Sequence, residues 1–357
     1  MYDVMVNKYG NPSSLHGMGL EAELAMKIAR SQIAAAMGTA PEAITFTSGA
    51  TEANNLALFG AAAKGRREGA RIVSTAFEHP SVLEPLRALE VKGYELVLLC
   101  PDQYGHIRPE AFAEQTDENT VLVSAMAVNN EFGSVLDVEA IAKAVKRKNP
   151  HTLVHSDASQ AFGKLPIRFG VTYLDLVTVS GHKLHAPKGV GALYMNRQLN
   201  IAPQLLGGGQ EGGLRSGTEA TSLIAGFGEA AEQASKNLAA ADKHVRTLNS
   251  YLRGELMSLP RVVINSPDEA VPYILNLSVP GIPSEVMMRF LEERGVYVSS
   301  GSACGKGKRS YALRSAELPA ELVASALRVG ISRFTTAEEI AAFVGALSQG
   351  IQSLKKR

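Results

Sequence analysis

The first two thirds of the chain alternate between two hydrophobic patterns. Longer segments such as residues 51–64 and 138–149 carry apolar positions at helical spacing. Short apolar runs predict strands at residues 43–48, 71–77, 94–99, 120–128, 152–157 and 174–180. Strands that alternate with helices are typical of a mostly parallel sheet that helices cover on both faces. We therefore predict a large three-layer α/β/α domain.

A helix is predicted before the first strand, over residues 20–37. Charged residues separate apolar positions that recur at helical spacing, at Leu20, Leu24, Ile28 and Ile33. Gly38 is the expected end of this helix, because glycine favours the residue just after a helix.

The pattern changes after residue 237. Helices are predicted at residues 237–257 and 284–295, and a last helix begins at Thr336 with Glu339 at the spacing of a capping box. Apolar runs predict strands at residues 261–266, 273–280, 296–300 and 326–332. We therefore expect residues 1–237 to form the large domain and residues 238–357 to form a smaller α+β domain.

Composition and charge exclude several classes of protein. The net charge is +1 over 357 residues and the basic residues are scattered, which disfavours a nucleic-acid partner. No apolar run reaches the length of a membrane span, and the N-terminus lacks a signal-peptide pattern, so the cytoplasm is the expected compartment. Cys100 and Cys304 are read as free thiols, and no metal site is predicted.

A lysine interrupts the stretch VTVSGHKLHAPKGVGALYM, residues 177–195. The first apolar run stops at Ser180, Lys183 follows three residues later, and a second apolar run begins almost at once. A lysine just past a strand usually points to solvent. Three other loops, each following a predicted strand, favour a functional interpretation.

The loop TSGATEANN, residues 47–55, joins a strand to a helix through small residues. Backbone N–H groups at the start of a helix can bind a phosphate there, with the Thr51 hydroxyl as a further donor. The alternative is that Thr51 only caps the helix.

The loops HSDASQ, residues 155–160, and FEHPSV, residues 77–82, carry further candidates. Asp157 could pair with a protonated ring nitrogen, or could cap a helix. His79 could stack on a planar ring, or could be a surface histidine. Phosphate donors, a carboxylate, an imidazole and a lysine at the strand ends of one sheet are the set that pyridoxal phosphate needs.

The ordered motifs resemble those of the NifS/IscS-type cysteine desulfurases. The resemblance covers nearly the whole chain and rests on TSGATEANN, EHPSV, VNNEFG (128–133), DASQAFGKLPI, SGHKLHAPKGVGALY, GGGQEGGLRSGT (207–218), SSGSACGKG (299–307) and LRVGISRFTTAEEI. It implies a homodimeric pyridoxal phosphate enzyme of fold type I that takes sulfur from L-cysteine and leaves L-alanine.

The resemblance also implies roles around the cofactor. Lys183 would hold the cofactor covalently and move the Cα proton, and His79 would stack on the ring and assist. Asp157 would pair with the ring nitrogen, and Gln160 would meet the ring oxygen. The phosphate would be bound by Ala50, Thr51, Ser180 and His182 of one subunit and by Thr218 of the other.

The remaining implied roles concern the substrate. Asn130 and Arg328 would bind the carboxylate side of L-cysteine, since a guanidinium suits a bidentate contact. Cys304 would receive the sulfur as a persulfide and pass it to an acceptor protein such as an iron–sulfur scaffold. Basic neighbours at Lys306, Lys308 and Arg309 favour the thiolate of Cys304, which is the nucleophilic form.

Two alternatives stay open. A selenocysteine lyase or a cysteine sulfinate desulfinase needs no attacking protein thiol, so Cys304→Ala discriminates these enzymes from a desulfurase. A truncated, non-catalytic homologue is the other alternative, because the family has a further segment before its GNPSS motif, here residues 10–14. Ser156 and His185 also depart from the family pattern.

Overall fold

The structure, a computed structural model, describes residues 1–65, 69–300 and 310–354. It divides into two compact units. The first unit consists of Met1–Leu99, Arg108–Ala127 and Asp137–Leu238, and the second of Cys100–Ile107, Val128–Leu136 and Ala239–Arg357. The domain boundary placed at residue 237 from the sequence remains a prediction.

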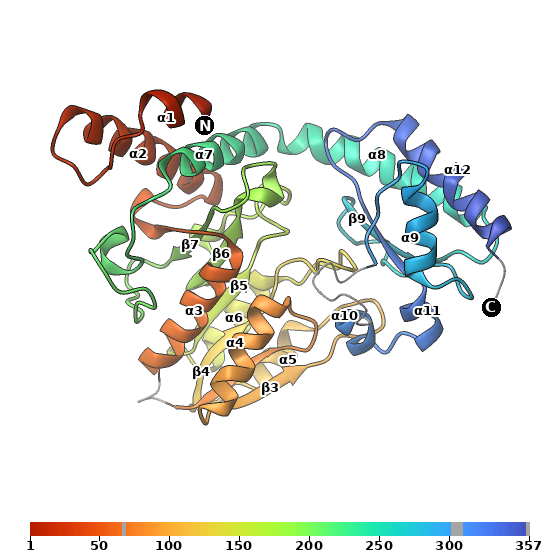
Figure 1. Cartoon of the computed structure of the whole chain (residues 1–357). Helices are drawn as coiled ribbons and strands as arrows, with labels where there is room; N and C mark the ends of the chain where they lie inside the picture. Colours follow the sequence, from red (N-terminus) through yellow and green to blue (C-terminus); the bar gives the residue numbers. More distant parts are fainter. Residues whose placement is uncertain (66–68, 301–309, 355–357) are drawn as a thin grey trace. The chain divides into compact units, whose positions relative to one another are not determined.

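The first unit is built on a seven-stranded sheet (Figure 1). In spatial order its strands are β1 (Ile44–Thr47), β7 (Gly191–Met195), β6 (Leu176–Ser180), β5 (Leu153–Asp157), β4 (Thr120–Ser124), β2 (Arg71–Thr75) and β3 (Glu95–Leu99). Strand β7 is antiparallel to both neighbours, and all other pairs are parallel. The predicted mostly parallel α/β sheet is confirmed.

Helices cover this sheet. They are α1 (Tyr2–Asn7), α2 (Gly17–Met37), α3 (Ala50–Gly65), α4 (Pro80–Val91), α5 (Pro109–Glu114), α6 (Val138–Lys148) and α7 (Thr221–Lys236). Helix α3 packs against five of the strands, and most of its apolar side chains are buried. Strands β4 and β6 are buried along their whole length, as expected for a sheet covered on both faces.

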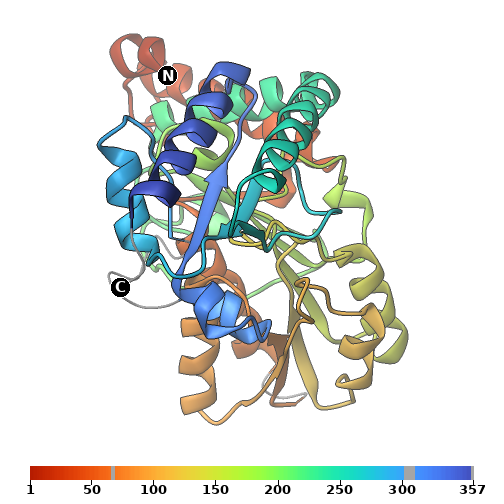
Figure 2. The same ribbon diagram turned by 90° about the vertical axis from the view of Figure 1, so that its right-hand side faces the viewer.

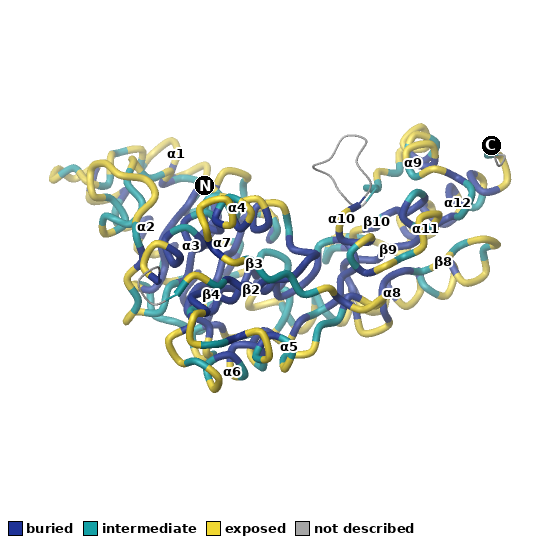
Figure 3. The backbone as a smooth tube through the Cα atoms, turned by 90° about the horizontal axis from the view of Figure 1, so that it is seen from below, coloured by how far each residue is buried: buried dark blue, intermediate teal, exposed yellow. Residues whose placement is uncertain are grey.

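Helix α2 ends at the residue that the sequence predicts, but its apolar residues lie on both its buried and its exposed face. Gly38 follows the helix with a φ of 68°. The buried face is rich in alanine and packs on α7, so closely that a Cβ on Gly228 would lie 2.5 Å from the Cα of Ala29. Leu20, Leu24 and Ile28 lie on the other face, with 52%, 49% and 61% of their surface exposed. Buried and exposed residues alternate along α2 (Figure 3).

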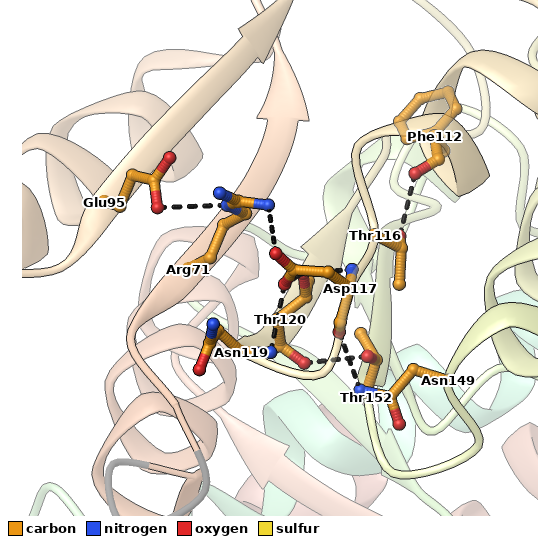
Figure 4. Close-up of polar contacts among 9 residues, drawn as sticks. All are labelled: Arg71, Glu95, Phe112, Thr116, Asp117, Asn119, Thr120, Asn149 and Thr152. Atoms are coloured by element: carbon orange, nitrogen blue, oxygen red, sulfur yellow. Dashed lines mark hydrogen bonds and ion pairs between the residues drawn. The ribbon is translucent and has the colours of Figure 1, made fainter.

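Polar contacts connect the amino ends of strands β2, β3 and β4 (Figure 4). Arg71 at the start of β2 donates from Nη1 to Asp117 Oδ2 at 2.5 Å and from Nε to Glu95 at the start of β3 at 3.0 Å. Asp117 Oδ1 accepts from Thr120 Oγ1 at the start of β4 at 2.9 Å. These bonds connect the strands at their amino ends, while the loops that carry the candidate site lie at the opposite, carboxyl edge.

The second unit contains an antiparallel three-stranded sheet and five helices among its described residues. Its strands are β10 (Ala326–Gly330), β9 (Ile274–Ser278) and β8 (Val263–Ile264), in that order. Its helices are α8 (Leu238–Met257), α9 (Ser284–Glu292), α10 (Tyr311–Ser315), α11 (Ala320–Ala324) and α12 (Ala337–Ser353). Figure 2 shows α9 and α12, both blue, beside each other.

Two predictions in this unit had different outcomes. The capping box of α12 is confirmed, because Thr336 and Glu339 each bond the backbone of the other. The strand predicted at residues 296–300 is wrong, since only Ser299 forms an isolated bridge, to Arg328. The backbone N–H of Val296 instead bonds the carbonyl of Leu291 and closes the end of α9.

Within the described part of the chain, no helix has the length and apolar character needed to cross a membrane.

Candidate active site

Gly191 brings two of the candidate loops together at the carboxyl edge of the sheet. In the strand register it stands opposite Thr47 of β1 on one side and opposite Ser180 of β6 on the other. A Cβ on Gly191 would lie 2.7 Å from the Cα of Gly49, so a glycine is required for this close approach. The phosphate-binding loop predicted at residues 47–55 therefore lies next to the end of the strand that precedes Lys183.

Helix α3 presents its N-terminus at this edge. It begins at Ala50, so Thr51 is inside the helix and is not its cap, contrary to the alternative considered from the sequence. Glu52 accepts from the backbone N–H of Ser48 at 2.9 Å and forms an ion pair with Arg215 at 2.7 Å. Burial alone would raise the pKa of Glu52, but the bonds from Arg215 and Ser48 lower it overall. The turn is thus held in the shape that exposes the first N–H groups of the helix.

Asp157 is the last residue of β5 and is buried. Its Oδ2 accepts from Nδ2 of Asn54 on α3 at 2.9 Å, and its Oδ1 accepts from the backbone N–H of Ser159 at 2.9 Å. Only turns follow it, up to residue 165, so Asp157 does not cap a helix. Two donors therefore fix the orientation of this carboxylate.

His79 is the N-cap of α4, a role the sequence analysis did not consider. Its Nδ1 accepts from the backbone N–H of Ser81 at 3.1 Å and lies 2.8 Å from Ser81 Oγ. Because Nδ1 accepts, the ring proton belongs on Nε2. Asn54 donates to Ser81 Oγ at 2.9 Å, so one chain of polar contacts joins His79 to Asp157 through Ser81 and Asn54.

Asn54 and Ser81 are therefore site residues that sequence reasoning missed. Both stand inside motifs used for the resemblance, and Asn54 is a fully buried amide on an otherwise apolar part of α3. A buried amide needs partners, and that requirement is the signal that could have pointed to Asn54.

Two buried ionisable residues stand close to Asp157. Burial, and then the charge of Asp157, raises the pKa of Glu78 to about 8, although its Oε1 accepts from Met126 N–H at 2.7 Å. Burial lowers the pKa of His155 to about 4, against the effect of Asp157. The imidazole of His155 lies between the hydroxyls of Ser124 and Thr178. Near neutral pH both Glu78 and His155 are therefore uncharged.

Lys183 lies on the short 3₁₀ turn Gly181–Leu184 that follows β6 directly, and it is half-buried. Partial burial and the positive charge of Lys183 lower the pKa of the neighbouring His182. Gln160 lies three residues past Asp157, and its Oε1 accepts from Lys164 Nζ at 3.2 Å. His185, which departs from the family pattern, ends the turn in the left-handed region with a φ of 65°. The other departure, Ser156, is buried beside Asp157.

Thr218 is exposed on the loop between β7 and α7. Two ion pairs attach this loop to its own chain, from Glu211 to Arg30 at 2.5 Å and from Arg215 to Glu52. The part of the loop that includes Thr218 therefore has a fixed anchor while its own surface faces outward.

The two substrate candidates meet within the second unit. Arg328 on β10 donates from Nη1 to the carbonyl of Asn130 at 2.8 Å. Next to Asn130, Glu131 is buried and its Oε2 accepts from Ser310 Oγ at 2.5 Å, while burial raises its pKa. Ser310 follows the segment that contains Cys304, and Cys304 itself lies outside the described residues.

The residues of the first unit fit pyridoxal phosphate chemically. Asp157 offers a buried, fixed carboxylate for a ring N–H, and Lys183 offers an amine one turn from the end of the adjacent strand. The start of α3 offers backbone N–H groups beside Ser180, which suits a phosphate.

Comparison with known proteins identifies the family. Residues 1–343 match the family described as Aminotransferase class-V. Cysteine desulfurase IscS of Serratia proteamaculans (strain 568) is 42% identical over 93% of this chain and 83% of its own length. IscS of Shewanella sp. (strain ANA-3) is 39% identical over 99% and 88%.

Solved structures support the same family assignment. A protein titled NifS-like superposes with a TM-score of 0.94 at 37% identity, covering 99% of this chain and 94% of that one. SspA in complex with cysteine superposes with a TM-score of 0.82 at 31% identity, covering 94% of both chains. The chain belongs to the aminotransferase class-V family and, within it, to the NifS/IscS type of cysteine desulfurases.

Proposed function

We propose that this protein is a pyridoxal phosphate-dependent cysteine desulfurase that converts L-cysteine to L-alanine and collects the sulfur on Cys304. The buried carboxylate of Asp157 carries the proposal, because the bonds from Asn54 and Ser159 hold it at the sheet edge that also bears Lys183. The names of the IscS relatives and the cysteine complex of SspA support the choice of substrate.

The residues of the first unit would bind the cofactor and move one proton. When bound, pyridoxal phosphate supplies an electron sink for the Cα–H bond of the substrate. Lys183 would hold the cofactor and its Nζ would then take the Cα proton, while Asp157 would keep a proton on the ring nitrogen. His79 would stack on the ring and Gln160 would donate to the ring oxygen. The phosphate would be bound by Ala50, Thr51, Ser180 and His182, and by Thr218 of a second subunit.

Arg328 and Asn130 would bind the substrate carboxylate. The bond from Arg328 Nη1 to the carbonyl of Asn130 fixes the plane of the guanidinium. Its remaining N–H groups can then meet the two carboxylate oxygens in a bidentate contact.

The sulfur transfer balances without an external oxidant or reductant. The Cys304 thiolate attacks the substrate sulfur, so that an S–S bond forms and the C–S bond breaks. The carbon that loses sulfur takes up a proton and leaves as the methyl group of L-alanine. Sulfur is oxidised to the persulfide level and carbon is reduced by the same two electrons. An acceptor protein such as an iron–sulfur scaffold then receives the sulfur.

The proposal includes a homodimer in the cytoplasm. Leu20, Leu24 and Ile28 form an exposed apolar stripe on α2, which a second copy would cover. A second copy would also supply Thr218. A reducing compartment suits the proposal, because the Cys304 thiol must stay reduced between turnovers.

The test is to load the protein with pyridoxal phosphate, add L-cysteine and a reducing thiol, and measure alanine and sulfide together. Equimolar products are expected, and Cys304→Ala should abolish both. Cys100→Ala is the matched control, since Cys100 is the exposed free cysteine of the described residues and should be dispensable. Wild-type protein that binds the cofactor but yields neither product would contradict the proposal. Full alanine and sulfide release by Cys304→Ala would replace it with a lyase that needs no protein thiol.

A further inference from the structure

An ion pair joins the loop that carries Thr218 to the turn that would bind the cofactor phosphate. Arg215 donates from Nε to Oε1 of Glu52 at 2.7 Å and from Nη2 to Oε2 of Glu52 at 3.2 Å. The two side chains are only 21% and 18% exposed. A bidentate contact fixes the relative orientation of two residues as well as their distance. The cofactor and substrate roles proposed above use neither Glu52 nor Arg215.

Glu52 belongs to the phosphate turn, residues 47–52. It follows Thr51 in the first turn of α3, and its Oε2 also accepts from the backbone N–H of Ser48 at 2.9 Å. Backbone N–H groups at the start of a helix are the expected phosphate donors of this turn. One carboxylate therefore bonds both the phosphate turn and Arg215.

Arg215 belongs to the segment of residues 205–218, which we call the arm. Two hydrogen bonds within the arm fix the residues between Arg215 and Thr218. Ser216 N–H donates to the carbonyl of Leu205 at 3.2 Å, and Gly217 N–H donates to Oε1 of Gln210 at 2.9 Å. A displacement of Arg215 would therefore displace Thr218 as well.

Packing contributes little to the position of the arm within its own chain. Leu206 is 83% exposed. In the described part of the chain, a Cβ on Gly209, Gly212 or Gly213 would meet no heavy atom within 4 Å beyond the adjacent residues. The position of the arm therefore depends mainly on its polar contacts.

The second polar attachment of the arm is made by Glu211, whose side chain is 2% exposed. Glu211 accepts from Arg30 Nη2 at 2.5 Å and from the backbone N–H of Phe46 at 2.8 Å. Phe46 lies on β1, the strand that leads into the phosphate turn. Glu211 thus bonds the arm to the strand before this turn, and Arg215 bonds it to the helix after the turn.

We propose that Arg215 is a positioning residue, which ties the arm to the phosphate turn of its own chain through Glu52 and so places Thr218 for the cofactor phosphate of a second copy. The inference rests on the proposed function, which assigns Thr218 to the site of the second copy. A bond within one chain would then set the cofactor affinity of the other chain.

A local role for the same ion pair predicts a different result. Arg215 also neutralises Glu52, whose carboxylate lies beside the N–H groups proposed to bind phosphate. If this neutralisation were its only role, loss of Arg215 would weaken phosphate binding in the same chain by like-charge repulsion. The two roles differ in which chain of a dimer loses cofactor affinity.

The first test measures cofactor affinity by titrating cofactor-free protein with pyridoxal phosphate and following the absorption of the bound cofactor. Arg215→Met should weaken binding as much as Thr218→Ala does, by about 10- to 100-fold, the worth of one charged hydrogen bond. Glu52→Gln should act in the same direction, although glutamine still accepts from Ser48 and leaves no unpaired carboxylate. Arg215→Lys keeps the charge without the bidentate contact and should lie between wild type and Arg215→Met.

Two further variants make this result specific. Arg215→Met combined with Thr218→Ala should bind no more weakly than Thr218→Ala alone, because Arg215 acts through Thr218. Arg71→Met is the matched control and should bind as wild type does. Arg71 also pairs with two carboxylates, but at the opposite edge of the same sheet.

The second test is subunit exchange, which shows whose site Arg215 serves. Arg215→Met chains are mixed with an equal amount of Lys183→Ala chains, which cannot hold the cofactor covalently. After random exchange, about half of the chains that retain Lys183 have a partner with an intact arm. These chains should bind the cofactor with wild-type affinity. They are counted by mass spectrometry of the Lys183 peptide after the bound cofactor has been fixed by borohydride reduction.

Three results would overturn the inference. Uniformly weak binding in the mixture would assign Arg215 to the site of its own chain. Additive losses in the double variant would mean that Arg215 does not act through Thr218, and wild-type affinity of Glu52→Gln would mean that the ion pair is not the link. These readouts need no turnover of L-cysteine. Failure of the desulfurase proposal would be seen separately, as missing alanine, and failure of the proposed dimer as a monomeric wild type in light scattering.

Discussion

Asn54 of α3 donates a hydrogen bond of 2.9 Å to Oδ2 of Asp157 at the end of β5. The same amide group donates to Ser81, whose hydroxyl lies 2.8 Å from His79 Nδ1. The buried side chain of Asn54 therefore orients two groups that are proposed to contact the cofactor. They are the Asp157 carboxylate, which would pair with the ring nitrogen, and the His79 imidazole, which would stack on the ring.

Asn54→Ala should impair both catalysis and stability. The substitution removes one of two donors to Asp157, and a small displacement of a reacting group can cost about 100-fold in rate. The lost buried hydrogen bonds should lower the free energy of unfolding by about 1–3 kcal/mol. The measurements are kcat/KM for L-cysteine and urea unfolding.

Asn55→Ala is the matched control for this prediction. Asn55 is the next residue on α3, and its amide bonds the carbonyl of Thr51. An equal loss of activity in both variants would show that α3 as a whole, and not the bond to Asp157, is what matters.

Glu78 should make the protein less stable as the pH rises through its folded pKa. That pKa is raised to about 8 from 4.5, mainly by burial, so the native state binds a proton that the unfolded state has lost between these values. The stability it contributes is fully present below pH 4.5 and is lost as the pH rises through 8. Glu78→Gln removes this dependence.

The expected loss of stability with rising pH is tested by comparing the urea midpoints of wild type and Glu78→Gln at pH 5 and pH 8. The variant should gain up to about 4 kcal/mol relative to wild type between the two values. Glu84→Gln is the control, since the Glu84 side chain is 66% exposed. Parallel midpoints for wild type and Glu78→Gln would mean that Glu78 is ionised in the native state.

Arg328→Lys should raise the KM for L-cysteine with a smaller effect on kcat. Lysine keeps the charge but cannot make a bidentate contact with a carboxylate, nor reproduce the fixed plane set by the bond to Asn130. Loss of one charged hydrogen bond is worth about 1.5–3 kcal/mol, or roughly 10- to 100-fold in KM. Arg294→Lys, a substitution of an exposed arginine that stacks on Phe290, should change neither constant. A fall in kcat at constant KM would assign Arg328 to a later step.

The sequence pattern predicts the sheet well because its signals are local. Runs such as residues 120–128 and 174–180 are mostly apolar, and the spacing of α3 and α6 is helical, so the alternation of strand and helix is visible without tertiary information. The segment at residues 296–300 shows the limit, because a short apolar run is compatible with closing a helix as well as with a strand.

The contacts of the site are less predictable, because they join distant residues. Asp157 and His79 stand out as polar residues after apolar strands. Nothing local shows that Asn54 links them, since its role depends on how α3 crosses the sheet. The packing of helix α2 is likewise not visible in the sequence. Four of its alanines (Ala22, Ala25, Ala29 and Ala34) are buried while Leu20 and Leu24 are exposed, because close contact with α7 requires small side chains.

The exposed apolar stripe on α2 predicts a dimer, and a single charged substitution within the stripe should dissociate it. Leu24→Glu places a carboxylate in the middle of Leu20, Leu24 and Ile28, where a second copy would have to bury it. Light scattering at micromolar concentration should find a dimer for wild type and a monomer for the variant. Val91→Glu is the control, because Val91 is 89% exposed on α4, away from the stripe. A dimeric Leu24→Glu protein would move the interface to another surface.

A mixing experiment tests whether the second copy completes the site. Lys183→Ala and Thr218→Ala should each be impaired alone, because every site then lacks one of the two residues. If Thr218 acts across the interface, a mixed dimer contains one site with both residues intact and one with neither. Random exchange of subunits should therefore restore activity to about a quarter of the wild-type value. If Thr218 instead serves its own chain, no mixed dimer holds an intact pair, and the activity of the mixture stays at the mean of the two variants.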